Sequence, residues 1–181
     1  MNIIRNSEEK IRAALLVQYD GTGFNGWQVQ KKGRTVQGEI EKALEVLLKQ
    51  KVRTVAAGRT DTGVHALGQV IHLDFSSNLS LQKLCISLNG ILDKDVSIKN
   101  AYYVPPEFHA RFSAQQREYI YIVYNHPLRN PLVLKKAMWV SQKVDVAFLR
   151  HISEYLIGEK DFASFCKKTS ADENTIRRID E

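Results

Sequence analysis

Apolar and polar positions along the first 104 residues follow strand-like and helix-like periods in turn. The helical stretches begin after Thr35 and Ser80, which are suitable N-cap residues. Short β-branched runs bounded by Gly, Asp or Ser predict the strands. The predicted elements, in chain order, are strand 13–19, helix 36–49, strand 52–57, strand 69–75, a helix starting at Leu81, and strand 96–104. This β-α-β-β-α-β order is the ferredoxin-like supersecondary pattern.

Pro105-Pro106 interrupts the pattern and divides the chain into two predicted halves, 1–104 and 105–181. The second half has a predicted strand at 117–125, another ending near Val140, and a helix over 146–157 that Asp145 caps and Gly158 ends, with the start of a further element at 175–179. Too few residues then remain for a full repeat. We therefore predict an α+β fold of two ferredoxin-like halves, the second incomplete.

Composition limits the functional classes without choosing one. Of the 181 residues, 44% are hydrophobic, which is sufficient for a packed core. The formal net charge of +6 favours an anionic partner, and nucleic acid is the commonest. Cys85 and Cys166 form no Cys-x-x-Cys motif, and no apolar run reaches membrane-spanning length. We expect a cytoplasmic protein that is not attached to a membrane.

The loop 57–66, Ala-Gly-Arg-Thr-Asp-Thr-Gly-Val-His-Ala, has the strongest chemical signal. It places the carboxylate of Asp61 between two predicted strands, with the cation Arg59 two residues before it and the turn residue Gly63 two residues after it. A nearby guanidinium would keep the carboxylate ionised. A turn aspartate that caps its own backbone is the structural alternative.

The same loop resembles the signature of the tRNA pseudouridine synthase A family. Three further stretches agree in the order that the family has them. They are 19–28 (Tyr-Asp-Gly-Thr-Gly-Phe-Asn-Gly-Trp-Gln) with Thr35-Val36-Gln37, then 108–114 (Phe-His-Ala-Arg-Phe-Ser-Ala) leading into 117–121, and finally 158–165 (Gly-Glu-Lys-Asp-Phe-Ala-Ser-Phe). Four matches in register make an accidental resemblance improbable.

The resemblance implies a pseudouridine-synthase-type mixed or antiparallel sheet and an isomerase that converts uridine to pseudouridine without metal or organic cofactor. Asp61 would be the nucleophile, attacking C1′ of the ribose or C6 of the base, or would only assist elimination. Tyr119 would stack on the flipped uracil, and Arg59 would pair with Asp61 or hold a phosphate, with a structural salt bridge as the alternative. The stretch Phe108, His109, Ala110 and Arg111 would contact tRNA, with a solvated strand edge as the structural alternative.

The resemblance also implies a homodimer acting on the tRNA anticodon stem-loop, at about positions 38 to 40, where RNA shape is recognised. Lys167 and Lys168 are further candidate phosphate contacts, although a solvated pair is an equal alternative. No segment here matches the family's Phe-x-x-x-Met-Val-Arg-like stretch, so we expect a chain that lacks the usual C-terminal portion.

Other interpretations of single motifs remain open. Asp61-Thr62-Gly63 is also the core tripeptide of aspartic proteases, but Arg59 would favour full ionisation and oppose the shared proton that those enzymes need. His65, His72 and Cys85 have no spacing typical of a zinc site, and a lone histidine such as His65 is more often structural. A module that binds RNA without turnover is the third possibility.

Overall fold

The computed structural model describes residues 10–166 and 174–181, and the chain falls into two compact units, Met1–Tyr119 and Ile120–Glu181. The predicted halves were divided after residue 104, so the first unit extends further and includes the stretch 105–119. Each unit is described by itself below.

The first unit contains six elements in the predicted order. They are β1 (Ile11–Tyr19), α1 (Val36–Leu48), β2 (Thr54–Ala56), β3 (Ala66–Phe75), α2 (Leu81–Ile91) and β4 (Val96–Tyr103). The strands form one sheet in the order β2-β3-β1-β4, and every neighbouring pair is antiparallel. The central strand β1 aligns Leu15 with Ile71 of β3 and with Ala101 of β4.

Both helices of this unit begin where the side-chain caps predict. The Thr35 hydroxyl accepts a hydrogen bond from the Gly38 amide, and the Ser80 hydroxyl accepts one from the Lys83 amide, which satisfies amides that have no partner within the helix. Lys49 ends α1 with φ 54°, a left-handed conformation common at helix C-termini. The predicted starts of both helices are confirmed.

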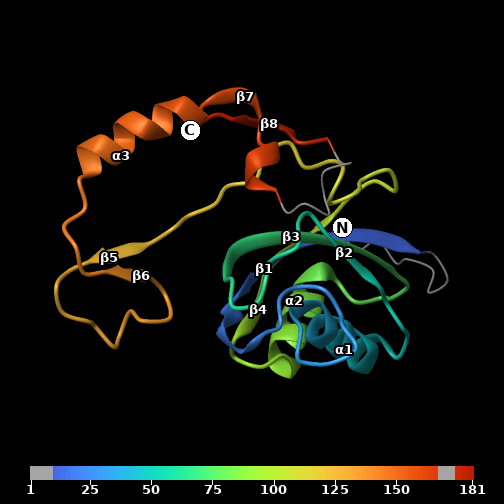
Figure 1. Cartoon of the computed structure of the whole chain (residues 1–181). Helices are drawn as coiled ribbons and strands as arrows, with labels where there is room; N and C mark the ends of the chain where they lie inside the picture. The colour runs from blue at the N-terminus through green and yellow to red at the C-terminus, as the bar shows by residue number, and fades with distance from the viewer. Residues whose placement is uncertain (1–9, 167–173) are drawn as a thin grey trace. The chain divides into compact units, whose positions relative to one another are not determined.

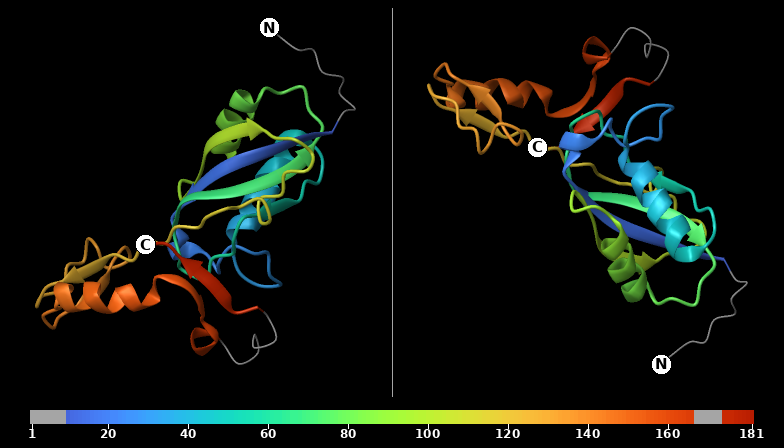
Figure 2. Two further views of the ribbon diagram at one scale, coloured as in Figure 1. Left: turned by 90° about the horizontal axis from the view of Figure 1, so that it is seen from above. Right: turned by 90° about the horizontal axis from the view of Figure 1, so that it is seen from below.

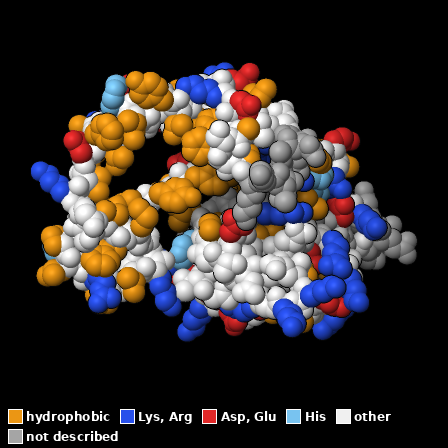
Figure 3. Space-filling view, viewed as in Figure 1, with side chains coloured by type: hydrophobic (Ala, Val, Ile, Leu, Met, Phe, Trp, Pro, Cys, Tyr) orange, Lys and Arg blue, Asp and Glu red, His pale blue; other side chains and the backbone are white. Residues whose placement is uncertain are grey.

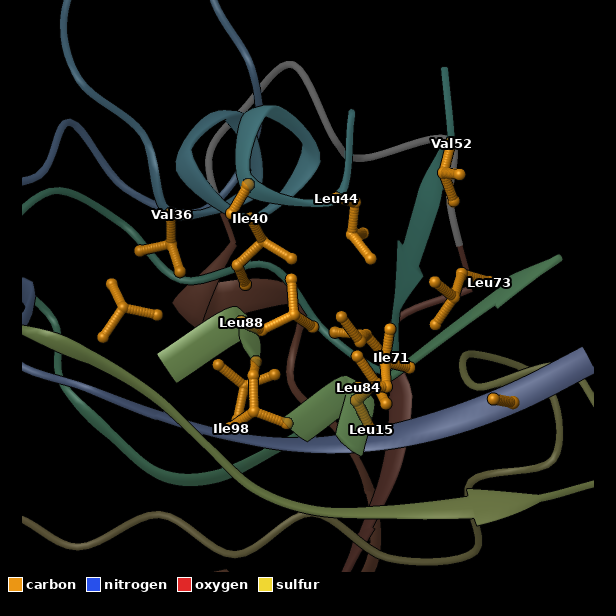
Figure 4. Packing of buried hydrophobic residues seen from close by; sticks show 14 of the residues in the cluster. Leu15, Val36, Ile40, Leu44, Val52, Ile71, Leu73, Leu84, Leu88 and Ile98 are labelled. Carbon is orange, nitrogen blue, oxygen red and sulfur yellow. The ribbon is translucent and has the colours of Figure 1, made fainter. Parts of the chain in front are cut away.

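The core of the first unit lies between the sheet and its two helices, which cover the same face of the sheet (Figures 1 and 2). Alternate residues of the central strands, such as Leu15 and Ile71, point toward Ile40 and Leu44 of α1 and Leu84 of α2 (Figure 4). All of these side chains are fully buried. Burial of this apolar face stabilises the unit far more than helix propensity does.

The described part of the second unit has two small sheets, one α-helix and two 3₁₀ turns, at Glu154–Leu156 and Ala163–Phe165. β5 (Val123–Asn125) pairs in parallel with β6 (Met138–Val140), α3 (Val146–Ser153) follows, and β7 (Gly158–Asp161) pairs antiparallel with β8 (Ile176–Ile179). Large apolar side chains gather on its surface over β5, β6 and α3 (Figure 3). Among the described residues, no hydrophobic side chain of this unit is buried.

Two predictions for the second half need correction. Residues 117–122 were predicted as part of a strand, but β5 begins only at Val123, where its pairing with β6 starts. The Ile122 carbonyl accepts from the Met138 amide at 2.8 Å, whereas no described strand pairs with 117–121, and a strand needs a paired neighbour. The helix over 146–157 ends early, at Ser153, and a 3₁₀ turn over Glu154–Leu156 follows it. Its predicted cap is confirmed, because the Asp145 carboxylate accepts from the Phe148 amide at 2.9 Å. Within the described ranges, no helix has the length and apolar character needed to cross a membrane.

Candidate functional site

Asp61 lies in the loop that joins β2 to β3, and its side chain is exposed. The loop turns at Gly63, whose φ of +80° favours glycine. A Cβ added at Gly63 would meet no atom within 4 Å, so the space beside this turn is open. The loop therefore presents a carboxylate next to a backbone that a ligand can approach closely.

The backbone of the Asp61 loop is anchored to the neighbouring loop 20–27. The Trp27 amide donates to the Thr60 carbonyl at 3.0 Å, and the Gly63 amide donates to the Phe24 carbonyl at 3.3 Å. The Tyr19 and Thr60 hydroxyls lie 2.7 Å apart in a further hydrogen bond. These contacts fix the residues on both sides of Asp61 and leave its own side chain exposed.

Two glycines of loop 20–27 allow this close approach. A Cβ at Gly21 would lie 2.0 Å from the Val64 carbonyl oxygen, and one at Gly26 would lie 2.6 Å from the Thr60 carbonyl oxygen. Gly26 also has φ +82°, a conformation that other residues rarely adopt. Gly21 and Gly26 are therefore explained by backbone packing against the Asp61 loop.

His65, at the end of the Asp61 loop, makes structural contacts. Its Nδ1 lies 3.0 Å from an Asp20 carboxylate oxygen and 3.2 Å from the Gly21 amide nitrogen. The half-buried ring thus ties the loop to the start of 20–27. This geometry agrees with a structural role for His65 rather than that of a metal ligand. Within 10–166 and 174–181, no group of three or more His, Cys, Asp or Glu side chains is placed to hold a metal ion.

Arg59 and Asp61 do not pair with each other. Both side chains are exposed, and no ion pair or hydrogen bond joins them within the described part of the chain. In water, an exposed pair gains little energy and loses side-chain entropy, so neighbouring positions in a loop do not enforce contact. Arg59 is thus available to a ligand beside Asp61.

The stretch with Phe108, His109, Ala110 and Arg111 is not a strand edge but part of a compact turn, 105–113, which lies against the sheet. Arg12 of β1 donates to the Pro106 and Phe108 carbonyls, and the Ala110 amide donates to His72 Nδ1 of β3. Ala110 is buried, whereas Arg111 is exposed. Of these four residues, Arg111 therefore has an exposed cationic side chain, whereas Ala110 holds the turn on His72.

Arg117 connects this turn to the Asp61 loop. Its guanidinium donates to the Ala57 carbonyl at 2.8 Å and to the Arg111 carbonyl at 3.2 Å. One side chain thus binds the start of the Asp61 loop and the backbone of the predicted RNA-contacting stretch. Tyr119, two residues further on, is 75% exposed at the end of the first unit. Lys167 and Lys168 lie outside the described residues.

Sequence reasoning missed several positioning residues: Arg12, Tyr19, Trp27, Thr60, His72 and Arg117. A polar residue at 72 within the apolar run 69–75 was the available signal. It could not be interpreted, because the turn that covers His72 begins more than thirty residues later in the chain. Contacts between such distant positions have no local sequence pattern.

Comparison with known proteins finds a matching family model and several proteins of similar sequence. A family model described as tRNA pseudouridine synthase matches residues 15–113, which contain the Asp61 loop, loop 20–27 and the turn 105–113. The tRNA pseudouridine synthase A of Paraburkholderia xenovorans is 43% identical over 168 residues, covering 93% of this chain and 62% of that protein. The protein of that name from Caldicellulosiruptor bescii is 42% identical, covering 91% and 68%, and the one from Leptospira biflexa is 46% identical, covering 92% and 64%. The chain thus spans about three-fifths to two-thirds of the length of these relatives.

Proposed function

Because the chain belongs to the tRNA pseudouridine synthase family, we propose that it isomerises uridine to pseudouridine in tRNA, with Asp61 as the nucleophile. The observation that carries the proposal is the placement of Asp61. Its loop is anchored through Thr60 and Gly63, while the carboxylate is exposed beside an open turn. A fixed backbone with a free carboxylate suits a group that must attack a bound substrate.

In the proposed reaction, the bond from C1′ of the ribose to N1 of uracil breaks, the base rotates, and C1′ bonds to C5. The C5 proton leaves to solvent and N1 gains a proton, so no oxidant, reductant or outside group is consumed. Asp61 attacks C1′ of the ribose or C6 of the base, and the bond that it forms breaks again when the product is released, which regenerates the carboxylate. Bound RNA would exclude water from the exposed carboxylate, because this chemistry needs a water-poor site. Arg59 would hold a phosphate beside the flipped nucleotide, and Tyr119 would stack on its base.

The RNA surface of the first unit would combine the Asp61 loop with the turn 105–113. The Arg117 guanidinium, which contacts the backbone of both, supports this assignment. Arg111 lies over the Phe112 ring at 5.6 Å, and Phe112 is 76% exposed. Exposed cations and rings are the groups that bind phosphates and unstacked bases in RNA. The net charge of +6 would favour the encounter.

Family resemblance supports the following assignments of substrate region, assembly, fold and compartment, and three observations on this chain agree with them. We assign the target to the anticodon stem-loop, at about positions 38 to 40, recognised by RNA shape. A homodimer would give the exposed apolar side chains of the second unit a surface to pack against. The β-α-β-β-α-β order and sheet order of the first unit support its assignment as a ferredoxin-like half, with the second half incomplete. Both cysteines are free, which suits a reducing compartment such as the cytoplasm.

A second candidate function is RNA binding without turnover. The exposure of Asp61 favours it, since an unshielded carboxylate is a poor nucleophile in water. In this case the turn 105–113 would hold tRNA, and no uridine would be converted.

Tritium release from tRNA labelled at C5 of uridine tests both functions. We expect release by this chain and none by Asp61→Asn, which removes the charge at nearly constant shape. The matched control is Asp180→Asn, which removes an exposed carboxylate of the second unit that pairs with Arg178. It should release tritium as the parent does.

Each outcome distinguishes the candidates. Release by Asp61→Asn at the parental rate would refute the nucleophile. No release by any variant, together with salt-sensitive tRNA binding, would establish the binding function. A chain that neither binds tRNA nor releases tritium would refute both.

A further inference from the structure

His72 is a buried polar residue on the face of the sheet opposite to the helices. Its neighbours Ile71 and Leu73 on β3 point into the core, so the alternation of a strand directs His72 to the other face. Only 5% of His72 is exposed. No helix covers it. The turn 105–113 does, through a hydrogen bond and two ring contacts.

The hydrogen bond between His72 and the turn requires one protonation state. The Ala110 amide donates to His72 Nδ1 at 3.1 Å in a buried position, and Ala110 is only 2% exposed. An Nδ1 that accepts a hydrogen bond has no proton of its own, so the ring is neutral and its proton is on Nε2. Protonation at Nδ1 would make two donors face each other where water cannot replace the lost partner.

Two aromatic rings of the turn pack around the same imidazole. The His109 ring centroid lies 4.8 Å from that of His72, and the Phe108 ring meets it edge-on at 6.3 Å. His109 in turn packs on Phe112, with centroids 4.4 Å apart. His72 is therefore the centre of a ring cluster that contains three of the side chains at the proposed RNA surface.

The charges around His72 favour its neutral form. Burial lowers the pKa of His72 below 6.5, and His109 from the turn and Arg12 from β1 lower it further, while Asp74 on β3 opposes them. β2, whose Val55 lies across from His72, brings no titratable side chain. Arg12 holds Asp74 in an ion pair at 2.6 Å, so part of the opposing negative charge is already neutralised.

We propose that neutral His72 is the positioning residue that holds the turn 105–113 on the sheet, and that protonation of its Nδ1 releases the turn. The consequence for RNA rests on the proposed function, in which this turn contacts tRNA. Release would move Arg111 and the ring of Phe112 from their fixed positions and would weaken the contact of Arg117 with the Arg111 carbonyl. Acid would then lower tRNA affinity even though it adds positive charge to the protein.

Three variants test the role of His72. His72→Asn places an amide oxygen near the position of Nδ1 and cannot be protonated, so it keeps the acceptor and loses the switch. His72→Ala removes the acceptor at every pH. His126→Asn is the matched control, since His126 is exposed in the second unit and contacts Leu128. His109 remains in all three variants.

The first measurement is amide hydrogen exchange at Ala110 in the full chain between about pH 5 and 8, corrected for the intrinsic rate. We expect parental protection to fall on acidification by roughly two- to twelvefold, the value of one hydrogen bond. His72→Asn should stay protected throughout, and His72→Ala should be unprotected throughout. Identical pH profiles for the parent and His72→Asn would overturn the proposal, and so would an NMR tautomer with the proton on Nδ1 at neutral pH. These two results do not depend on whether His72→Ala folds.

The second measurement is tRNA affinity of the same proteins at constant salt over the same pH range. The parent should lose affinity relative to His72→Asn as pH falls, while His126→Asn follows the parent. If the parent and His72→Asn bind tRNA with equal affinity at low pH, although the Ala110 amide of the parent has lost protection, the link to RNA is overturned. If no protein binds tRNA but Ala110 exchange behaves as expected, the positioning role of His72 stands and the proposed function fails.

Discussion

The hydrogen bond between Tyr19 and Thr60 offers the sharpest test of how the Asp61 loop is held. Tyr19 ends β1 and is 3% exposed, and its hydroxyl lies 2.7 Å from that of Thr60, the residue before Asp61. Tyr19→Phe removes only this hydroxyl and keeps the ring against Trp27, with centroids 6.0 Å apart. Burial raises the pKa of Tyr19 despite hydrogen bonding to Thr60 and Gln69, so the group is a neutral phenol at physiological pH.

The size of the effect follows from the environment of the bond. A net intramolecular hydrogen bond contributes about 0.5–1.5 kcal/mol, and leaving a fully buried partner unsatisfied costs about 1–3 kcal/mol. Thr60 is only half-buried, so water can reach its hydroxyl after the substitution. We therefore expect Tyr19→Phe to lower the free energy of unfolding by about 1 kcal/mol. We also expect a lower kcat for tritium release, because a misplaced loop moves Asp61 away from the reacting atoms.

Urea unfolding followed by tryptophan fluorescence measures the stability effect. The chain has two tryptophans, so a Trp139→Phe background leaves Trp27 as a reporter of the first unit alone. Tyr155→Phe, at a tyrosine that is 67% exposed, is the matched control and should be neutral. A double-mutant cycle with Thr60→Val should give a coupling energy above about 0.5 kcal/mol. A smaller coupling, with additive losses, would refute the idea that this bond holds the loop.

Three further predictions concern the core, the loop contact and the acid response. Leu15→Ala, at a fully buried position of the central strand, should lower the free energy of unfolding of the first unit by about 2–5 kcal/mol in urea unfolding. Gly26→Ala should cost more stability than Gly63→Ala by the same assay, because both have positive φ but only Gly26 would bring a Cβ within 2.6 Å of a carbonyl oxygen. The hydrogen bond from Arg12 lowers the pKa of Asp74 below 3.8, so this carboxylate stabilises the fold above that pH and its contribution is lost as pH falls through the lowered value. Asp74→Asn should therefore flatten the loss of stability in acid titrations monitored by circular dichroism, and an unchanged slope would contradict the assignment.

Local sequence signals determined much of the first unit because short-range physics decides them. The alternation of apolar residues set the strands, helical spacing set the buried faces of α1 and α2, and the hydroxyls of Thr35 and Ser80 fixed where the helices begin. The motif around Asp61 resembles the family's signature over a few adjacent residues, and that resemblance implied the candidate nucleophile. The role of Asp61 itself stays a prediction.

The predicted second half, 105–181, shows where local signals fail. Residues 117–122 have strong β-propensity, yet they lie outside any strand, because a strand is stabilised by a partner and the partner is not encoded locally. The early end of α3 at Ser153 has the same cause, since none of its side chains is buried to extend the helix.

Tertiary structure alone decided how the candidate site is held together. The contact of Tyr19 with Thr60 spans 41 residues, that of His72 with Ala110 spans 38, and that of Arg117 with Ala57 spans 60. The sequence supplies the donors and acceptors, but only the antiparallel sheet brings them within 3 Å or so of each other. The sequence by itself therefore indicated the family and the candidate residue Asp61, while the fold decided that Asp61 is exposed on an anchored loop and that His72 lies beneath the turn 105–113.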